Sequence, residues 1–363
     1  EYIRAFLTTA IGGLPPKTPL NPKITATLQR SGYRIEKLIF ESQPRFYVTA
    51  SVFVPEGPGP FPAVVGVAGH SASGKAIDTY QHVWISLAKR GVLTMAIDPA
   101  GQGERLQYLN PATGKSTIGV GVPEHIHDGL LTLLTGAAYA RYEIWDGMRA
   151  VDYLLTRDDV DPKKLGVAGN SGGGTQSAYL AAMEPRLAAA VASCYITSWE
   201  TLWSGPGPQD AEQIFPGFLK AGLDFPDFLL AFAPRPILMT TAIQDYFPIA
   251  GARATYAEAK RLFEVADAPG RAGYFEFDDK HGWSQPRREA AYEFLGKPGK
   301  EPAVDPEPEQ LLYATRTGQV ITSLGGEWPE IRAAMESGRT GVKYIPEWDR
   351  LVDLGTRLGS PAD

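Results

Sequence analysis

A serine set between glycines has the surroundings of a nucleophile in this sequence. Gly169, Ser171 and Gly173 form the pattern G-x-S-x-G, which is short enough to need structural context before it carries weight. The apolar run 165–169 precedes it, and the small, helix-compatible segment 174–183 follows it. We therefore predict a sharp strand-to-helix turn that presents the Ser171 hydroxyl above a sheet edge.

A serine hydroxyl is a weak nucleophile until a base takes its proton and an acid orients that base. Of the five histidines, only His281 follows Ser171 in the chain. Asp245 follows the apolar run 237–241, in the order serine, acid, histidine that accompanies such a turn. We predict Asp245 as the acid and His281 as the base. The other candidates for the acid are Glu200, Asp278 and Asp279.

Two backbone N–H groups are expected to face the oxyanion that such a serine generates. One is that of Gly172, at the start of the following helix. The other is expected in the loop after the apolar run 63–68, from His70 or Ser71. Ser71 itself lies in Gly-His-Ser-Ala-Ser, which imitates the nucleophile pattern but has serine in place of the last glycine. Ser71 is therefore the weaker alternative as nucleophile.

The elements that must position these residues alternate between strands and helices. Near-continuous apolar runs are typical of strands buried on both faces, and the intervening helix-length segments indicate a doubly wound, mostly parallel α/β sheet. The predicted strands are 63–68, 92–97, 165–169, 189–194, 237–241 and 274–277, and the predicted helices are 80–90, 139–156, 174–183, 250–266 and 287–294. In such a sheet, functional residues lie at the carboxyl ends of the strands.

Three parts are expected along the chain. Residues 1–62 form an N-terminal extension with an antiparallel strand pair, 34–40 and 46–54, that is joined as a hairpin near Gln43 and Pro44. Residues 63–296 form the catalytic α/β domain, with an aromatic cap inserted at about 195–233. Residues 297–363 begin as a Pro-rich linker and continue as an appendage, with a short strand pair near 313–324 and a helix near 328–337.

The segment from about residue 60 to residue 294 resembles the acetyl xylan esterase-like branch of the α/β-hydrolases. The resemblance rests on the segments 98–104, 142–165, 169–174, 233–236 and 281–282. It implies the α/β-hydrolase fold, and it implies that the family's nucleophile, acid and base correspond to Ser171, Asp245 and His281. The branch includes carbohydrate deacetylases, other carboxylesterases and relatives of prolyl oligopeptidases, so the resemblance specifies the substrate only weakly. The histidine at position 70 departs from a plainer Gly-rich loop.

The walls of the pocket are expected from two insertions. Aromatic faces stack on sugar rings, so Trp199, Trp203 and Trp283 are candidate substrate contacts, although most of the cap's rings are expected to form its own core. His125 is a further candidate. The run His125-Ile126-His127-Asp128 is also compatible with metal binding, but no partners for it are recognisable elsewhere in the sequence. We therefore expect neither a metal nor another cofactor.

Composition limits the partners. The 35 Lys and Arg residues against 41 Asp and Glu give a net charge of −6, which argues against a nucleic-acid partner. No apolar run reaches the roughly 18 residues of a membrane span. The single cysteine, Cys194, excludes an internal disulfide. The chain begins at Glu1 rather than Met, and together with the resemblance this favours a secreted or periplasmic protein whose signal peptide is absent from this chain. The sequence carries no signal for an oligomeric state.

These observations favour a serine esterase acting on short acyl esters, such as acetylated carbohydrates, through an acyl-enzyme. A peptidase or amidase of the prolyl oligopeptidase type is the first alternative, although only about 60 residues precede the sheet, too few for the large gating domain of those enzymes. A hydrolase fold retained as a non-catalytic binding module is the second alternative.

Overall fold

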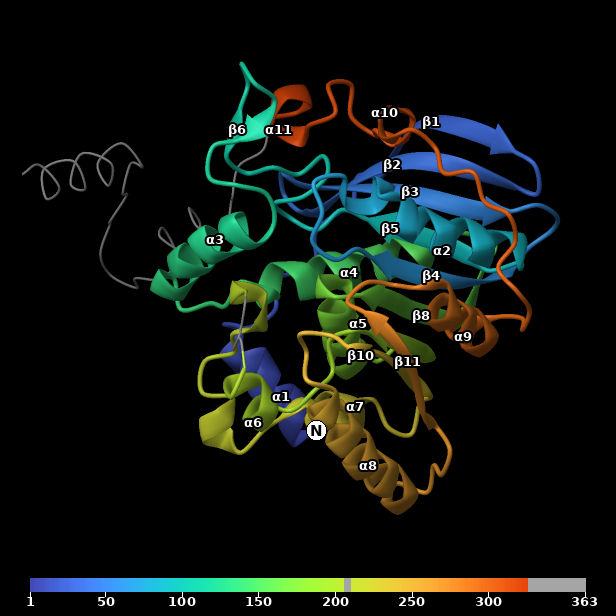
Figure 1. The fold of residues 1–363 in the computed structure, drawn as a ribbon. Coiled ribbons are helices and arrows are strands. Elements are labelled where there is room, and N and C mark those ends of the chain that lie inside the picture. Colours follow the sequence, from blue (N-terminus) through green and yellow to red (C-terminus); the bar gives the residue numbers. More distant parts are fainter. Residues whose placement is uncertain (206–209, 326–363) are drawn as a thin grey trace, which may run out of the picture.

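A nine-stranded sheet lies at the centre of the computed structural model, which describes residues 1–205 and 210–325 (Figure 1). The strands lie in the order β1-β2-β3-β5-β4-β8-β9-β10-β11. The pairs from β1 to β5 are antiparallel, and those from β5 to β11 are parallel. The bounds are β1 (Lys23–Arg30), β2 (Tyr33–Gln43), β3 (Phe46–Pro55), β4 (Phe61–Val67), β5 (Leu93–Ile97), β8 (Val160–Asn170), β9 (Ala189–Ser193), β10 (Ile237–Gln244) and β11 (Ala272–Lys280).

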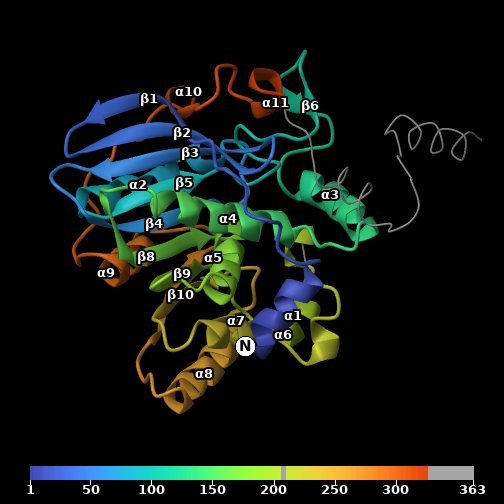
Figure 2. The ribbon, with the colours of Figure 1, turned by 180° about the vertical axis from the view of Figure 1, so that it is seen from behind.

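Helices cover both faces of the sheet. On one face lie α2 (Asp78–Lys89) and α9 (Gln285–Leu295) (Figure 1). On the opposite face lie α4 (Ala140–Leu154), α5 (Gly172–Met183) and α8 (Ile249–Val265); α4 and α5 are in front when the molecule is seen from behind (Figure 2). The N-terminal helix α1 (Tyr2–Ala10) packs on the α5 side. This arrangement confirms the predicted α/β class.

Burial on both faces explains why the parallel strands are apolar throughout. Successive side chains of a strand point to opposite faces. In β4, Val65 belongs to the core under α4 and α5, whereas Val64 belongs to the core under α2 and α9. In β10, Met239 and Leu238 divide in the same way. Each strand therefore needs apolar residues at nearly every position.

The predicted strands and helices of the sheet domain are all present, with boundaries that differ by a few residues. The predicted hairpin is also present as β2 and β3, with Arg45 at a positive φ of 64° in its turn. The N-terminal sheet is larger than the predicted pair, because β1 adds a third antiparallel strand at the edge.

Two insertions rise beside the carboxyl ends of the strands. The first contains the short pair β6 (Leu109–Asn110) and β7 (Lys115–Ser116), followed by α3 (Val122–Leu134). The second is the cap, built from α6 (Trp199–Trp203), two 3-10 turns at 211–213 and 219–221, and α7 (Phe225–Phe232). The cap rings that are buried against one another are Tyr195, Phe215, Phe218, Phe225, Phe228 and Phe232. These rings are buried as expected, but they continue the core of the sheet domain rather than forming a separate one, because Phe215 and Phe228 pack on Tyr179 of α5.

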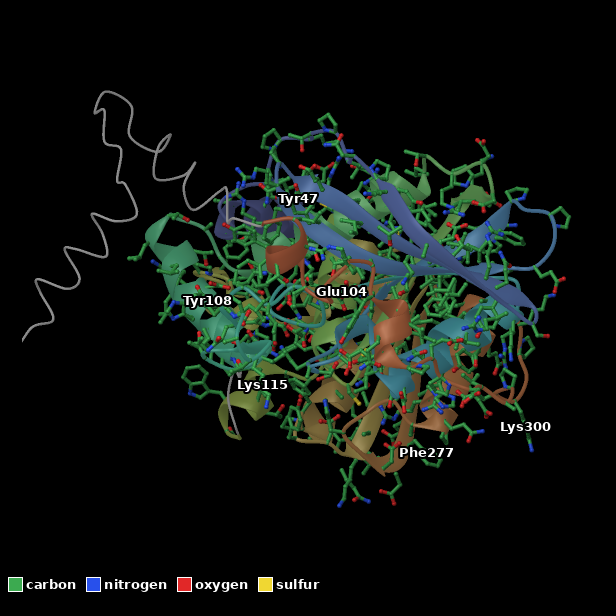
Figure 3. All side chains as sticks on the ribbon, turned by 90° about the horizontal axis from the view of Figure 1, so that it is seen from above. Tyr47, Glu104, Tyr108, Lys115, Phe277 and Lys300 are labelled. Atoms are coloured by element: carbon green, nitrogen blue, oxygen red, sulfur yellow. The ribbon has the colours of Figure 1, made fainter. Side chains whose placement is uncertain are left out.

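The C-terminal segment, residues 297–325, runs back over the sheet domain and contains the short helices α10 (Glu309–Leu312) and α11 (Val320–Ser323). The strand pair predicted near 313–324 is wrong. The N–H groups of Ala314 and Thr315 donate to the Glu104 carboxylate at 2.7 Å each, rather than to a neighbouring strand. Figure 3 shows Glu104 beside this segment. The helix predicted at 328–337 lies outside the described residues.

Within the described residues, no helix combines the length and apolar character needed to cross a membrane.

Candidate active site

Ser171 occupies the turn between β8 and α5. Its φ of 60° and ψ of −126° are unusual for a residue with a side chain, and such strain is typical of functional sites. The Ser171 N–H donates to the Ser193 carbonyl at 2.9 Å, which ties the turn to β9. The turn needs glycine around it: a Cβ on Gly173 would lie 2.1 Å from the Val67 carbonyl oxygen. The glycines therefore allow α5 to approach the sheet closely enough to expose the serine.

The sheet brings Asp245 and His281 to this turn. Each follows the end of one of two paired strands, and Gln244 at the end of β10 lies opposite Lys280 at the end of β11. His281 Nδ1 lies 2.8 Å from one carboxylate oxygen of Asp245 and 3.0 Å from the other. His281 Nε2 lies 2.8 Å from Ser171 Oγ. The three predicted side chains thus meet although they are far apart in the chain.

The exposure of Asp245 and His281, and the tautomer of the His281 ring, both suit proton transfer from Ser171. The Asp245 side chain is 3% exposed and the His281 side chain 25% exposed. Because a carboxylate only accepts hydrogen bonds, Nδ1 carries the proton and Nε2 of the neutral ring presents its lone pair to the serine. The nearby Cys194 thiol stays protonated, because burial raises its pKa to about 12.

The other candidate acids lie elsewhere. Glu200 and Asp278 are exposed. Asp278 accepts a hydrogen bond from Gln244, and Asp279 pairs with the buried Arg287 at 3.2 Å. Among the candidate acids, only Asp245 contacts the imidazole of His281 in the described structure.

Two of the three candidate oxyanion donors have an N–H group that is free to bind an oxyanion in the described structure. In the described structure, the N–H groups of Gly172 and His70 have no protein acceptor. The Ser71 N–H, by contrast, donates to Gln102 Oε1 at 2.7 Å. The assignment of Ser71 as a donor is therefore corrected, because its N–H is already engaged by a side chain from the loop after β5.

The predicted tryptophan wall is not found at this site. Trp283 is 2% exposed and packs edge-on against Trp84 in the core, with ring centroids 5.9 Å apart, so its assignment to the pocket is corrected. Trp203 is 69% exposed. It lines a groove on the cap with Trp199 and Phe218, and none of Ser171, Asp245 and His281 lines that groove.

His125 is also not a wall of an open pocket. Its side chain is fully buried on α3, where Nδ1 lies 2.9 Å from Asp210 Oδ2 and Nε2 lies 2.9 Å from the Ala100 carbonyl oxygen. Its expected contact with substrate is corrected, because its ring is enclosed between α3 and the cap.

Tyr246 is a site residue that the sequence analysis did not identify. Its hydroxyl lies 3.1 Å from His281 Nε2, the nitrogen that also faces Ser171. Its ring lies over the imidazole, with centroids 4.3 Å apart, and partial burial raises the pKa of its hydroxyl to about 12. The available signal was its position directly after Asp245, at the carboxyl end of a parallel strand.

Comparison with known proteins identifies the family. The sequence profile of the acetyl xylan esterase family (AXE1) matches residues 16–209, more than half of the 363-residue chain. The chain belongs to the acetyl xylan esterase family. This family is one of carboxylic ester hydrolases, as the sequence resemblance indicated.

Individual relatives are more distant. The protein YtaP of Bacillus subtilis (strain 168) is 26% identical over 206 residues, covering 53% of this chain and 62% of YtaP, so the match spans less than two thirds of that relative. Among solved structures, the methylesterase BT1017 gives a TM-score of 0.70 at 21% identity, over 98% of this chain and 74% of that chain. Acetyl xylan esterase 1 from Thermoanaerobacterium sp. JW/SL YS485 gives 0.59 at 18% identity, over 81% of this chain and 93% of that chain. These likenesses establish the α/β-hydrolase fold.

Proposed function

We propose that this acetyl xylan esterase family member is a serine carboxylic-ester hydrolase that works through an acyl-enzyme. One observation carries the proposal: Ser171, on a strained strand-to-helix turn, lies 2.8 Å from the imidazole of His281, whose other nitrogen lies 2.8 Å from the buried Asp245. That geometry lies within the hydrogen-bond reach that a nucleophile and its base require.

In the first half of the reaction, Ser171 Oγ attacks the ester carbonyl carbon while its proton moves to His281 Nε2. The carboxylate of Asp245 holds the imidazole in place and stabilises the imidazolium that forms. The negative charge on the former carbonyl oxygen is stabilised by the N–H groups of Gly172 and His70. The imidazolium then gives its proton to the leaving alcohol as the C–O bond breaks, which leaves the acyl group on the serine.

In the second half, water takes the place of the alcohol. His281 Nε2 removes a proton from the water as its oxygen attacks the acyl carbon. The resulting oxyanion uses the same two N–H groups, and the proton returns to Ser171 Oγ as the acid departs. The protein is thereby regenerated unchanged.

The proposed substrate is an ester with a short acyl group, such as an acetylated carbohydrate. Family membership supports the acetyl group. The contact of the Tyr246 ring with the imidazole also supports it, because this ring occupies space beside the histidine nitrogen that faces the attacking hydroxyl. A compact acyl group needs less of that space than a long chain does.

The proposal is tested with 4-nitrophenyl acetate and a panel of acetylated sugars. We expect the purified wild-type chain to turn over the acetate, and Ser171→Ala to lose nearly all of this activity. Ser71→Ala is the matched control, because it removes the hydroxyl of the other serine in an elbow-like sequence. A fluorophosphonate probe should label wild type and Ser71→Ala but not Ser171→Ala.

Three results would contradict the proposal. Retention of activity or labelling in Ser171→Ala would place the nucleophile elsewhere. Faster turnover of a proline-containing peptide amide than of acetate esters would favour a peptidase. An unlabelled wild-type serine without turnover of any ester would indicate a non-catalytic binding module.

A further inference from the structure

A second cluster of polar side chains lies behind the nucleophile turn. Asp210 Oδ2 lies 2.7 Å from His70 Nε2 and 2.9 Å from His125 Nδ1, and the two imidazole nitrogens are 3.3 Å apart. Glu212 Oε1 lies 4.0 Å from His70 Nε2. One ligand-type atom from each of the four residues lies within 4.8 Å of all the others. The four come from the loop after β4, from α3 and from the cap, so the cluster joins three separate segments.

The hydrogen-bond pattern leaves this cluster short of donors. His125 Nε2 lies 2.9 Å from the Ala100 carbonyl oxygen, which can only accept, so Nε2 carries a proton. In the neutral ring Nδ1 then presents a lone pair, and it faces the Asp210 carboxylate, another acceptor. A proton on His70 Nε2 can satisfy only one of these two acceptors. At least one pair of acceptors therefore faces each other at hydrogen-bond distance unless an additional positive charge lies between them.

Glu212 supplies an independent observation. It is fully buried, and neither carboxylate oxygen accepts a hydrogen bond from a side chain or backbone N–H in the described structure. Its neighbour Glu143 is a second buried carboxyl group. A buried carboxyl group without a donor is costly, and cation binding is one of the few arrangements that compensate it.

We propose that His70, His125, Asp210 and Glu212 bind a divalent cation of the zinc class. Two imidazole nitrogens and two carboxylate oxygens are typical zinc ligands, with bonds of about 2.0–2.2 Å. In a tetrahedral site such bonds separate neighbouring ligand atoms by about 3.3 Å. The separations of 2.7, 2.9, 3.3 and 4.0 Å bracket that value, so small side-chain movements would complete the site.

The surroundings suit a metal site as well. Metal-bound histidines usually donate their other ring N–H to a carbonyl or carboxylate, which fixes the tautomer. His125 makes this contact with Ala100, and Tyr139 stacks on the opposite part of the ring with centroids 4.6 Å apart. Three of the four side chains are at most 1% exposed, whereas His70 is 24% exposed and offers the ion a route of entry.

The ion would act as an anchor for the proposed active site. The side chain of His70 would contact the ion, and its backbone N–H is one of the two donors proposed for the oxyanion. Gly172 lies beside the same cluster, since a Cβ built on it would lie 3.2 Å from Glu212 Oε1. Binding of the ion would thus fix the loop after β4 against the nucleophile turn. This consequence rests on the proposed function, but the ion site itself does not.

The site is tested by metal analysis of the full chain. Protein stripped with a chelator is titrated with Zn²⁺ by calorimetry, and bound metal is measured by mass spectrometry after desalting. The test variants are His125→Gln and Asp210→Asn, and the matched control is His127→Gln. His127 lies on the same helix but is exposed and packs on Tyr108 outside the cluster. Co²⁺ provides an optical readout, because tetrahedral coordination gives visible absorption that octahedral hydration does not.

We expect about one Zn²⁺ per wild-type chain, about one for His127→Gln, and at least about 100-fold weaker binding for the two test variants. Ser171→Ala should bind the ion as wild type does, so this result is separate from the fate of the proposed esterase. Absence of stoichiometric binding in wild type would overturn the inference, and so would equal affinity of His125→Gln and His127→Gln. Should a test variant fail to fold, the wild-type stoichiometry and Co²⁺ spectrum decide alone, and a spectrum without tetrahedral bands would count against the site.

Discussion

Asp245→Asn removes the negative charge from the proposed triad of Ser171, His281 and Asp245, and it leaves the size of the side chain nearly unchanged. The Asp245 carboxylate lies 2.8 and 3.0 Å from His281 Nδ1 and is 3% exposed. At an effective dielectric constant of about 20, opposite unit charges about 3 Å apart attract by roughly 5.5 kcal/mol. This attraction exists only after the imidazole has accepted the serine proton, so it stabilises the transition state more than the ground state.

The expected loss of rate follows from that energy. At about 1.4 kcal/mol per tenfold, 5.5 kcal/mol corresponds to roughly 10⁴-fold. The His281 side chain is 25% exposed, and solvent screening lowers this value. We therefore expect kcat/KM of Asp245→Asn to fall by about 10²- to 10⁴-fold, the range that loss of an orienting acid can cause.

The assay is hydrolysis of 4-nitrophenyl acetate near pH 8, with the melting temperature measured beside it to verify folding. Asp278→Asn is the matched control, because Asp278 is exposed and adjacent in the chain to the same histidine loop. It should keep kcat/KM within about twofold, since exposed substitutions rarely perturb a site. If a folded Asp245→Asn retained more than a tenth of wild-type activity, Asp245 would not be the orienting acid.

Three further predictions concern other parts of the structure. Tyr246→Phe should raise kcat/KM up to about tenfold, because it removes a competing donor worth about 0.5–1.5 kcal/mol from the histidine nitrogen; a loss beyond tenfold in steady-state kinetics would instead make Tyr246 part of the catalytic machinery. Although burial opposes it, contact with Lys75 lowers the pKa of Glu104, so its contribution to stability is present above about pH 4.5 and is lost as the pH falls further. Glu104→Gln should therefore lower the free energy of unfolding by about 3–5 kcal/mol at pH 7. Urea unfolding at pH 7 and pH 4 should show a smaller difference between the two free energies than in wild type, and an unchanged difference would contradict this. Gly173→Ala should lower the melting temperature by at least several degrees, because its Cβ would lie 2.1 Å from a backbone oxygen, whereas Gly205→Ala, with 3.7 Å to its nearest neighbour, should change it little.

Much of the sheet domain could be predicted because its signals are local. The apolar runs that became β4, β8 and β10 are buried on both faces, so each run marks a strand without reference to the rest of the chain. The order of strands and helices then places Ser171 and His281 at the same sheet edge. Their convergence follows from the topology of a parallel sheet rather than from any single motif.

Other elements lacked such a signal. β1 has a mostly exposed pattern as an edge strand, so its sequence resembles a loop. The helix α3 exposes apolar residues, among them Leu130 and Leu134 at 63% and 82%, so its pattern does not mark one buried face. Trp283 was expected at the pocket as an aromatic face for a sugar ring, yet its side chain packs in the core under α2.

The histidine and carboxylate cluster was beyond sequence reasoning for a different reason. His125 meets His70 across 55 residues and Asp210 across 85 residues. A metal pattern is recognised in sequence by short, regular spacing between ligands, which this set does not have. The run of residues 125–128 contains one member of this cluster, His125, but its partners become visible only once the loop after β4 and the cap are placed beside α3.

The contact between Glu104 and the C-terminal segment has a consequence for the order in which this chain is assembled. Glu104 accepts hydrogen bonds from residues that follow it by 210 and 211 positions, and the Val320 N–H donates to its carbonyl oxygen. During synthesis from the N-terminus, the ribosome releases all nine strands before it releases these donors. Until then, Lys75 is the only one of the described partners of this carboxylate that is already in the chain. Packing of residues 314–320 onto the finished sheet domain is therefore a late step. A nascent chain halted before residue 313 would carry all nine strands but would leave Glu104 without its backbone donors.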